Sequence, residues 1–171
     1  MLFDKLYDEY YSVIFNYCLR RTGDFHQAYD IASQTFLKAY LKFDNYEEKG
    51  IPVVHWFYRI ASNEINLFFR SKKYSPTLIK NVYGNYLEEL HSYEIEKEIE
   101  SANIEFEKNM EFIKLHQAVK QLPTNYSDVI SLKYFEGMTI LEISQILKKK
   151  EGTVKSLLSR GISKLRKIMT N

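Results

Sequence analysis

The hydrophobic residues of this chain recur at intervals of three and four positions, which is the spacing of one face of an α-helix. In the first half of the chain, this spacing predicts helices over residues 3–20, 25–42 and 53–73. In the second half, it predicts helices over residues 111–122, 124–136, 139–147 and 152–169. The pattern therefore indicates an all-α protein.

The same spacing predicts which side chains are buried. We expect Tyr7 and Cys18 on the inner face of the first helix and Phe57 on that of the third. In the second half, Tyr134 and Met169 fall on predicted inner faces. Cys18 is the only cysteine, so the chain has no internal disulfide, and its place on an apolar face predicts a packing role rather than a reactive one.

Polar residues that can cap a helix stand where several of these stretches begin. Asp24 precedes the second helix, and Thr124 or Asn125 is expected to cap the helix that follows Pro123. Thr139 comes before the apolar spacing of residues 140–147, and Glu142 three residues later completes the pattern of a capping box. We expect these side chains to accept hydrogen bonds from the first turn of each helix.

The distribution of charge divides the chain further. Residues 74–110 contain three Lys and eight Glu, a net charge of −5, and their apolar positions are imperfectly spaced. Residues 111–171 carry a net charge of +6. We therefore predict two small helical domains, residues 1–73 and 111–171, joined by an acidic linker over residues 74–110 that contains some helix.

The last two predicted helices form a helix-turn-helix pattern, because a short polar break at Lys148, Lys149 and Lys150 joins them. In such motifs the second helix can enter the major groove of DNA. Its polar face carries Lys155, Ser156, Ser159, Arg160, Ser163, Lys164 and Lys167. Cationic side chains can bind the phosphates of DNA, and short polar side chains near the start of the helix can form hydrogen bonds with base edges. An ordinary helical hairpin with a solvated basic face remains the alternative.

The third predicted helix carries a second polar stripe. It consists of Arg59, Asn63, Asn66 and Arg70, near Trp56 and a loop over residues 43–55 that has no helical period. Aromatic rings that stack on bases, combined with cations that hold the backbone, are typical of sites for unpaired nucleic acid. The stripe is equally what a surface helix shows, with Trp56 in the core.

Catalytic and metal-binding patterns are missing from the sequence. The four histidines are scattered, one cysteine cannot supply a zinc finger, and no glycine-rich phosphate loop occurs. We therefore expect no enzyme activity, no catalytic residue, no metal and no cofactor. Acidic residues interrupt any N-terminal signal sequence, and no stretch is long enough to span a membrane, so we expect a cytoplasmic protein that does not bind membranes.

Two motifs resemble those of a known family. G-M-T-I-L-E-I-S-Q-I-L at residues 137–147, followed by G-T-V-K-S at 152–156, resembles region four of sigma-70-family initiation factors of the extracytoplasmic-function (group four) type. A-Y-D-I-A-S-Q-T-F-L-K-A-Y at residues 28–40 and the segment 51–70 resemble region two of that family. Asn66 stands where the family usually has Asp. Luminescence-regulator-type response regulators have a similar helix-turn-helix.

The resemblance implies a function and a set of site residues. Core RNA polymerase, promoter DNA and an anti-sigma protein are the implied partners. The residues implied to face the polymerase are Asp30, Gln34 and Lys38. Those implied to bind the minus-ten element are Trp56, Arg59, Asn63 and Arg70, with the loop over residues 43–55 holding a flipped base. Those implied to bind the duplex minus-thirty-five element are Thr153, Lys155, Ser156, Ser159, Arg160 and Lys164.

Two other functions fit the same residues. The first is a conventional DNA-binding regulator, in which the N-terminal domain senses a ligand or partner. The second is a helical interaction module with no role on nucleic acid. A regulator should bind duplex DNA by itself, usually as a dimer on paired half-sites. An interaction module should show no salt-dependent affinity for DNA.

Overall fold

The computed structural model describes residues 2–47, 49–72 and 110–171, and the predicted linker falls outside this range except for its last residue. The described chain is all-α, as predicted. Its N-terminal elements are α1 (Leu2–Thr22), α2 (Phe25–Lys42), the 3-10 turn η1 (Phe43–Asn45) and α3 (Val53–Lys72). Its C-terminal elements are α5 (Met110–Gln121), α6 (Thr124–Ile130), the π-helical turn η2 (Ser131–Phe135), α7 (Ile140–Leu147) and α8 (Glu151–Thr170).

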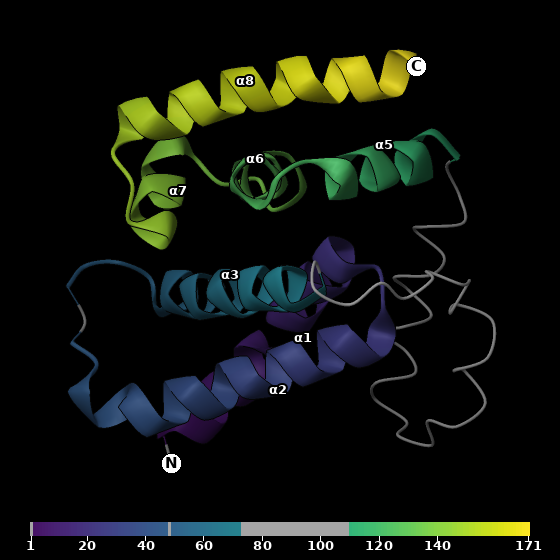
Figure 1. Ribbon diagram of the computed structural model, residues 1–171. Coiled ribbons are helices and arrows are strands. Elements are labelled where there is room, and N and C mark those ends of the chain that lie inside the picture. Colours follow the sequence, from purple (N-terminus) through teal and green to yellow (C-terminus); the bar gives the residue numbers. More distant parts are fainter. Residues whose placement is uncertain (1, 48, 73–109) are drawn as a thin grey trace.

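These elements form two layers that pack on each other (Figure 1). The N-terminal layer contains α1, α2 and α3, and the C-terminal layer contains α5 to α8. Helix α3 packs against α1 and α2 on one side and against α6 and α7 on the other. Helix α8 lies along the outer edge of the C-terminal layer. Within the described ranges, no helix has the length and apolar character needed to cross a membrane.

Aromatic side chains dominate the core of the N-terminal layer. Phe57 of α3 is fully buried, and its ring lies 4.8 Å from that of Phe36 and 6.4 Å from that of Phe3, centroid to centroid. Such ring pairs contribute roughly 0.5–1.5 kcal/mol beyond the area that they bury. Ala28 and Ala32 of α2 are also completely buried in this core. Phe57 and Cys18 are fully buried, as predicted.

Aliphatic side chains form the core of the C-terminal layer. Its fully buried members are Val129, Leu132, Ile143, Ile146 and Val154. Helix α8 approaches α6 closely at Gly161, where an added Cβ atom would lie 2.9 Å from Cδ1 of Ile130. A glycine at this position therefore permits the packing that holds α8 in place.

Local side-chain signals mark the starts of α2 and α7. The Asp24 side chain accepts a hydrogen bond from the Gln27 backbone, and Thr139 and Glu142 form the predicted capping box, with both hydrogen bonds present. The cap predicted at Thr124 or Asn125 is wrong, because α6 begins at Thr124 and Pro123 occupies the cap position without a side-chain hydrogen bond. Proline fixes φ near −65°, so it can lead directly into a helix, and its carbonyl accepts the first backbone bonds.

Three predicted inner positions are exposed. Tyr134 is 58% exposed because the π-helical turn η2 adds a residue to its turn and rotates the following side chains outward. Met169 is 51% exposed near the end of α8, and Tyr7 is 41% exposed, although its ring contacts Tyr11 and Phe36 at its edge of the core. Helical spacing alone cannot show where the covering layer ends.

Candidate nucleic-acid interface

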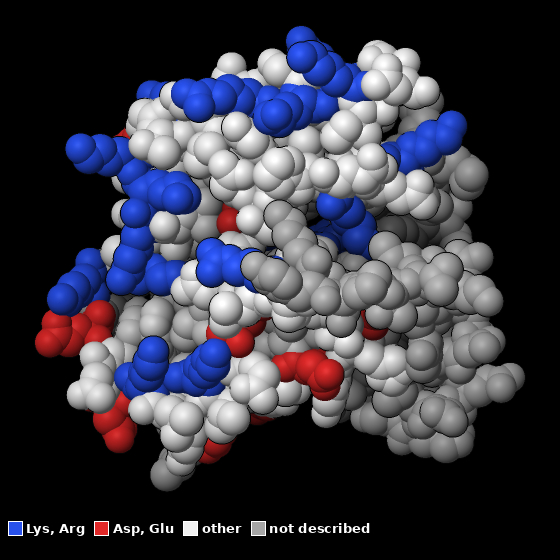
Figure 2. Space-filling view, viewed as in Figure 1, with Lys and Arg blue, Asp and Glu red and all other residues white. Residues whose placement is uncertain are grey.

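The polar face of α8 is open to solvent. Figure 2 shows Lys and Arg side chains gathered along the outer edge of the C-terminal layer, where α8 lies. All six residues that we predicted for duplex DNA are exposed: Thr153, Lys155, Ser156, Ser159, Arg160 and Lys164. Val154 and Leu158 hold the helix from its opposite face, since both are buried against the rest of the layer. The packing therefore presents the predicted residues as one surface.

The turn before α8 is short and basic. Lys148 ends α7 with φ 52° and ψ 46°, a left-handed conformation, and its N–H donates to the Ser144 carbonyl. Lys148, Lys149 and Lys150 are exposed, and they add positive charge beside the start of α8. This is the geometry of a helix-turn-helix, with the second helix free to enter a groove.

One of the predicted DNA contacts already has a partner within the layer. The Nζ atom of Lys164 lies over the Tyr126 ring, 5.5 Å from its centroid. This cation–π contact directs the Lys164 side chain toward α6, which contains Tyr126. On the same helix, the Ser163 hydroxyl donates to the carbonyl of Ser159, so it is directed toward the backbone.

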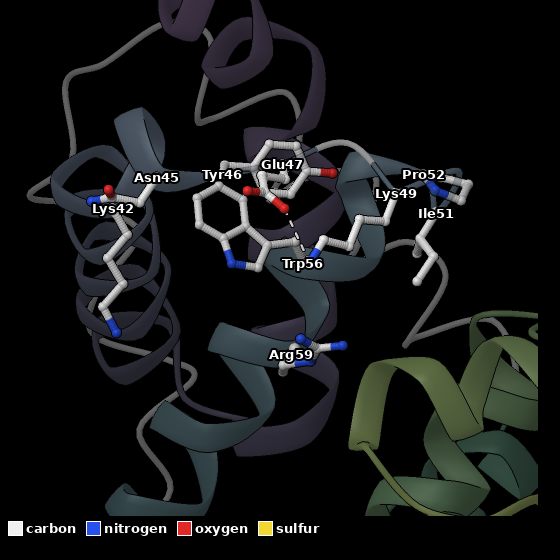
Figure 3. Close-up of a pocket in the computed structure, with 9 residues that line it drawn as sticks. All are labelled: Lys42, Asn45, Tyr46, Glu47, Lys49, Ile51, Pro52, Trp56 and Arg59. Carbon is white, nitrogen blue, oxygen red and sulfur yellow. Dashed lines mark ion pairs between the residues drawn. The ribbon is translucent and has the colours of Figure 1, made fainter.

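A pocket of 670 Å³ lies where the loop between α2 and α3 meets the start of α3 (Figure 3). The residues that line it are Lys42, Asn45, Tyr46, Glu47, Lys49, Ile51, Pro52, Trp56 and Arg59. The rings of Tyr46 and Trp56 stack with centroids 4.6 Å apart, and Lys49 pairs with Glu47 at 3.1 Å. The pocket thus combines aromatic faces with cations, which suits an unstacked base and its phosphate.

The stripe predicted on α3 is divided between different surroundings. Asn63 and Arg70 are exposed, but Arg59 and Asn66 contact the C-terminal layer. Nε and Nη2 of Arg59 donate to the carbonyls of Ile146 and Gln145, at 3.0 and 2.5 Å. Burial lowers the pKa of Arg59. Of the predicted minus-ten residues, the structure brings Trp56 and Arg59 to the pocket, whereas Asn63 and Arg70 are not among its lining residues.

The residues predicted to face the polymerase lie on α2. Asp30 and Gln34 are exposed, whereas Lys38 forms an ion pair of 2.5 Å with Glu64 of α3. The helix also exposes large apolar side chains, which our sequence analysis did not single out as site residues: Tyr29, Leu37, Tyr40 and Leu41. Their signal in the sequence is that α2 has more apolar residues than one buried face can hold.

Sequence reasoning also missed a set of charged contacts between the two layers. Arg21 of α1 donates to Asp128 of α6 at 2.6 Å, and both side chains are almost completely buried. Asp128 also accepts from Asn66 of α3 at 3.0 Å. Burial alone would lower the pKa of Arg21, but Tyr17 and Asp128 raise it overall, so its charge is retained.

A second polar contact between the layers centres on Glu136. Its carboxylate accepts hydrogen bonds from Arg20 of α1, at 2.6 and 3.0 Å, and from the Tyr58 hydroxyl of α3, at 2.8 Å. Burial and the charge of Glu136 raise the pKa of Tyr58, so the phenol stays a hydrogen-bond donor. Burial likewise raises the pKa of Tyr17 to about 12.

The described residues contain no group of His, Cys, Asp and Glu that could hold a metal ion. His55 approaches Glu142 at 3.6 Å, which places one more polar pair between α3 and α7.

Comparison with known proteins assigns both halves to one family. The family model "Sigma-70 region 2" matches residues 6–74, and "Sigma-70, region 4" matches residues 112–165. The ECF RNA polymerase sigma factor SigW of Bacillus subtilis is 32% identical over 167 residues, which cover 96% of this chain and 87% of SigW. SigL of Mycobacterium tuberculosis, also an ECF RNA polymerase sigma factor, is 30% identical over 165 residues, with 96% and 87% covered.

Solved structures have the same fold. The sigma factor RpoE of Bartonella quintana, in complex with the anti-sigma factor NepR, aligns with a TM-score of 0.68 at 18% identity and covers 98% of this chain and 96% of its own. CnrH, in complex with the cytosolic domain of CnrY, aligns with a TM-score of 0.66 at 18% identity and covers 98% and 87%. Together with the matches in sequence, this establishes that the chain belongs to the sigma-70 family of RNA polymerase sigma factors, in the ECF group.

Proposed function

We propose that this chain binds core RNA polymerase and directs it to promoters, where transcription starts. The observation that carries the proposal is the pairing of two different nucleic-acid surfaces in one chain. The basic face of α8 suits duplex DNA, and the stacked pocket at the start of α3 suits an unpaired base. The surfaces occur in the order of region two and region four, in residues 1–73 and 111–171, with residues 74–110 as the linker.

Helix α8 recognises the duplex minus-thirty-five element in this proposal. Thr153, Arg160 and Lys164 contact phosphates, and each neutralised phosphate releases counterions and makes binding depend on salt. Lys155, Ser156 and Ser159 are near the helix start, and they contact base edges in the major groove. The three exposed lysines of the turn, residues 148–150, add affinity that does not depend on sequence.

The pocket at the start of α3 captures one base of the minus-ten element. Unstacking a base from the duplex costs a few kcal/mol, roughly. Stacking on an aromatic side chain such as Trp56 returns about 1–3 kcal/mol, and charged contacts to the backbone add to it. Arg59, Asn63 and Arg70 supply those contacts along the displaced strand. The chain makes and breaks no covalent bond in this scheme, because binding energy alone opens the duplex.

The outer face of α2 docks on the polymerase. Asp30, Gln34 and Lys38 supply polar contacts. The exposed apolar residues Leu37, Tyr40 and Leu41 supply apolar surface that docking buries. Burying such side chains is worth about 25 cal/mol per Å² of apolar surface. The polymerase acts in the cytoplasm, so this is where we expect the chain to work. An anti-sigma protein is a further partner that the family assignment supports.

Co-purification with bacterial core RNA polymerase tests the docking surface. We expect a one-to-one complex in size exclusion with the wild-type chain, and its loss in the double variant Asp30→Arg/Gln34→Arg. The matched control is Asp8→Arg/Gln117→Arg, which changes the same residue types at exposed positions on α1 and α5 and should still bind. Failure of the wild-type chain to bind, together with tight affinity for duplex DNA by the chain alone, would instead identify a conventional regulator.

A further inference from the structure

The pocket at the start of α3 contains an aromatic platform that is anchored to the core. The ring of Tyr46 stacks on that of Trp56, with centroids 4.6 Å apart, and lies nearly parallel to the ring of Phe43, 6.4 Å away. Trp56 in turn contacts Phe57, which is fully buried. A base that stacks on this platform is therefore held in one plane. Stacking alone does not distinguish the bases, because every base has an aromatic face.

An ion pair lies beside the platform. Figure 3 shows Glu47 and Lys49 next to the rings of Tyr46 and Trp56, with a dashed line between the two charged groups. Nζ of Lys49 is 3.1 Å from Oε2 of Glu47, and each side chain is 74% exposed. An ion pair this exposed contributes little to stability, because solvent screens it and ordering two side chains costs entropy. Both groups can therefore exchange water for a ligand.

The carboxylate of Glu47 is unusual in a pocket for nucleic acid. The other charged residues among the described lining residues are cations: Lys42, Lys49 and Arg59. Cations attract the phosphates of a strand, whereas a carboxylate repels them. A carboxylate favours binding of nucleic acid where it accepts hydrogen bonds from a base. The position of Glu47 beside the platform therefore indicates contact with the edge of the stacked base.

The ion pair presents two acceptors and a donor side by side. The carboxylate of Glu47 supplies two acceptor oxygens, and the ammonium of Lys49 supplies the donor. The Watson–Crick edge of guanine carries the complementary groups, since its N2 amine and N1–H donate and its O6 accepts. Adenine, cytosine and thymine each have a single donor group on this edge, so one carboxylate oxygen stays unpaired or faces an acceptor. The pair thus imitates the edge of cytosine, the partner of guanine in a duplex.

We propose that the Glu47–Lys49 ion pair makes this pocket selective for guanine. The inference rests on the proposed capture of a base in the pocket, and it adds which base is captured and which residues select it. Stacking on Trp56 supplies affinity for any base. The ion pair supplies the selection, because a base other than guanine leaves polar groups of the complex without partners.

Selection is measured by fluorescence anisotropy on the full chain in complex with core RNA polymerase, with core polymerase alone as the blank. The probes are four labelled dT 20-mers in which one central base is guanine, adenine, cytosine or thymine. We expect the guanine strand to bind about tenfold more tightly than the other three. If no strand binds beyond the blank, the proposed capture of a base fails, and the selection fails with it. If all four bind beyond the blank equally well, capture stands and the selection is wrong.

Two pairs of variants assign the selection to the ion pair. Glu47→Gln replaces an acceptor oxygen by a donor and should reduce the preference for guanine to less than about threefold. Asp44→Asn makes the same change at an exposed position of η1 outside the lining, and it should keep the preference. Lys49→Met should also reduce the preference, whereas Lys42→Met removes another lining cation and should weaken all four strands equally. A full preference for guanine in Glu47→Gln would overturn the proposal.

Base analogues identify the edge that is read. Hypoxanthine lacks the N2 amine of guanine and should lose most of the preference, whereas 7-deazaguanine keeps the Watson–Crick edge and should bind as guanine does. Lysine side chains can instead read N7 and O6 of guanine, as in the major groove. In that case 7-deazaguanine would bind weakly and hypoxanthine would bind as guanine does, and that result would overturn the role of Glu47.

Discussion

Helices α3 and α8 are alike in sequence and different in surroundings. Each has 20 residues, each is amphipathic, and each carries a polar stripe that we predicted to bind nucleic acid. Helix α3 is covered from both sides, by α1 and α2 and by α6 and α7, whereas the polar face of α8 is open (Figures 1 and 2).

The difference shows that a polar stripe does not establish a free surface. Arg59 and Asn66 of α3 donate hydrogen bonds to groups of the C-terminal layer, and Asn63 and Arg70 are exposed. On α8, the corresponding residues are exposed, and no element of the described ranges packs outside that helix. The chemistry of the side chains is similar, so the position of the helix decides their availability.

The largest expected effect concerns the core face of α3. Phe57→Ala should destabilise the chain by about 3–5 kcal/mol, because it removes a fully buried ring from contact with Phe36 and Phe3. Leu67→Ala, at a position of α3 that is 51% exposed, should change stability by less than about 0.5 kcal/mol. Urea unfolding followed by circular dichroism measures both, and equal losses would mean that α3 has no distinct core face.

The inner face of α8 should show the next largest effect. Gly161→Leu should cost roughly 1–3 kcal/mol, because even a Cβ atom there meets Ile130 at 2.9 Å. Gly152→Leu, in the same helix with nothing within 4 Å of an added Cβ, should be close to neutral. Thermal unfolding distinguishes the two, and a mild effect of Gly161→Leu would show that α8 can move away from α6.

The layer that covers α3 should weaken in acid. Burial, aided by the charge of Arg20, lowers the pKa of His116 from 6.5 to about 4. Between these values the unfolded chain binds a proton that the folded chain does not, so stability falls as the pH falls from 6.5 toward 4. We expect a loss on the order of 2 kcal/mol. Urea unfolding at several pH values should show that the His116→Gln variant loses less stability than wild type over this interval. If its unfolding free energy depends on pH as steeply as that of wild type, His116 is not the group responsible.

The open face of α8 predicts two different effects on DNA binding. Arg160→Ala should weaken binding on every promoter variant and reduce the salt slope by about 1, since it removes one phosphate contact. Ser156→Ala should change the preference at particular bases. Anisotropy of the polymerase complex on a set of promoter duplexes measures both. Equal losses on every variant for the two substitutions would rule out this division of roles.

The smallest expected effect lies in the turn that sets the direction of α8. Lys148 has φ 52°, and left-handed backbone costs a residue with a Cβ about 1 kcal/mol or more. Lys148→Gly should therefore stabilise the C-terminal layer by about 0.5–1 kcal/mol in thermal unfolding. Lys149→Gly is the control, since its φ is not positive, and it should not stabilise. If both substitutions raised the thermal stability, the cause would be reduced repulsion among the neighbouring lysines and not relief of backbone strain at Lys148.

The sequence predicted the fold class and the individual helices. The capping box of Thr139 and Glu142 and the cap at Asp24 were predictable because each depends on residues three positions apart. The exposed face of α8 was predictable from the spacing of its hydrophobic residues, because the helical period places the buried residues on one face and the polar residues on the other. The burial predicted for Tyr134 was wrong, because the spacing of hydrophobic residues contains no signal for the π-helical turn η2.

The tertiary structure alone decided which predicted surfaces are available. Arg21 and Asp128 are 107 positions apart, and Arg59 and Ile146 are 87 apart, so no local pattern connects them. Periodicity and capping act over one or two turns, and they therefore determine helices from sequence. The pairing of Arg59 with the end of α7 depends on how two layers pack, because that packing alone brings a side chain of α3 to the free carbonyls of another helix.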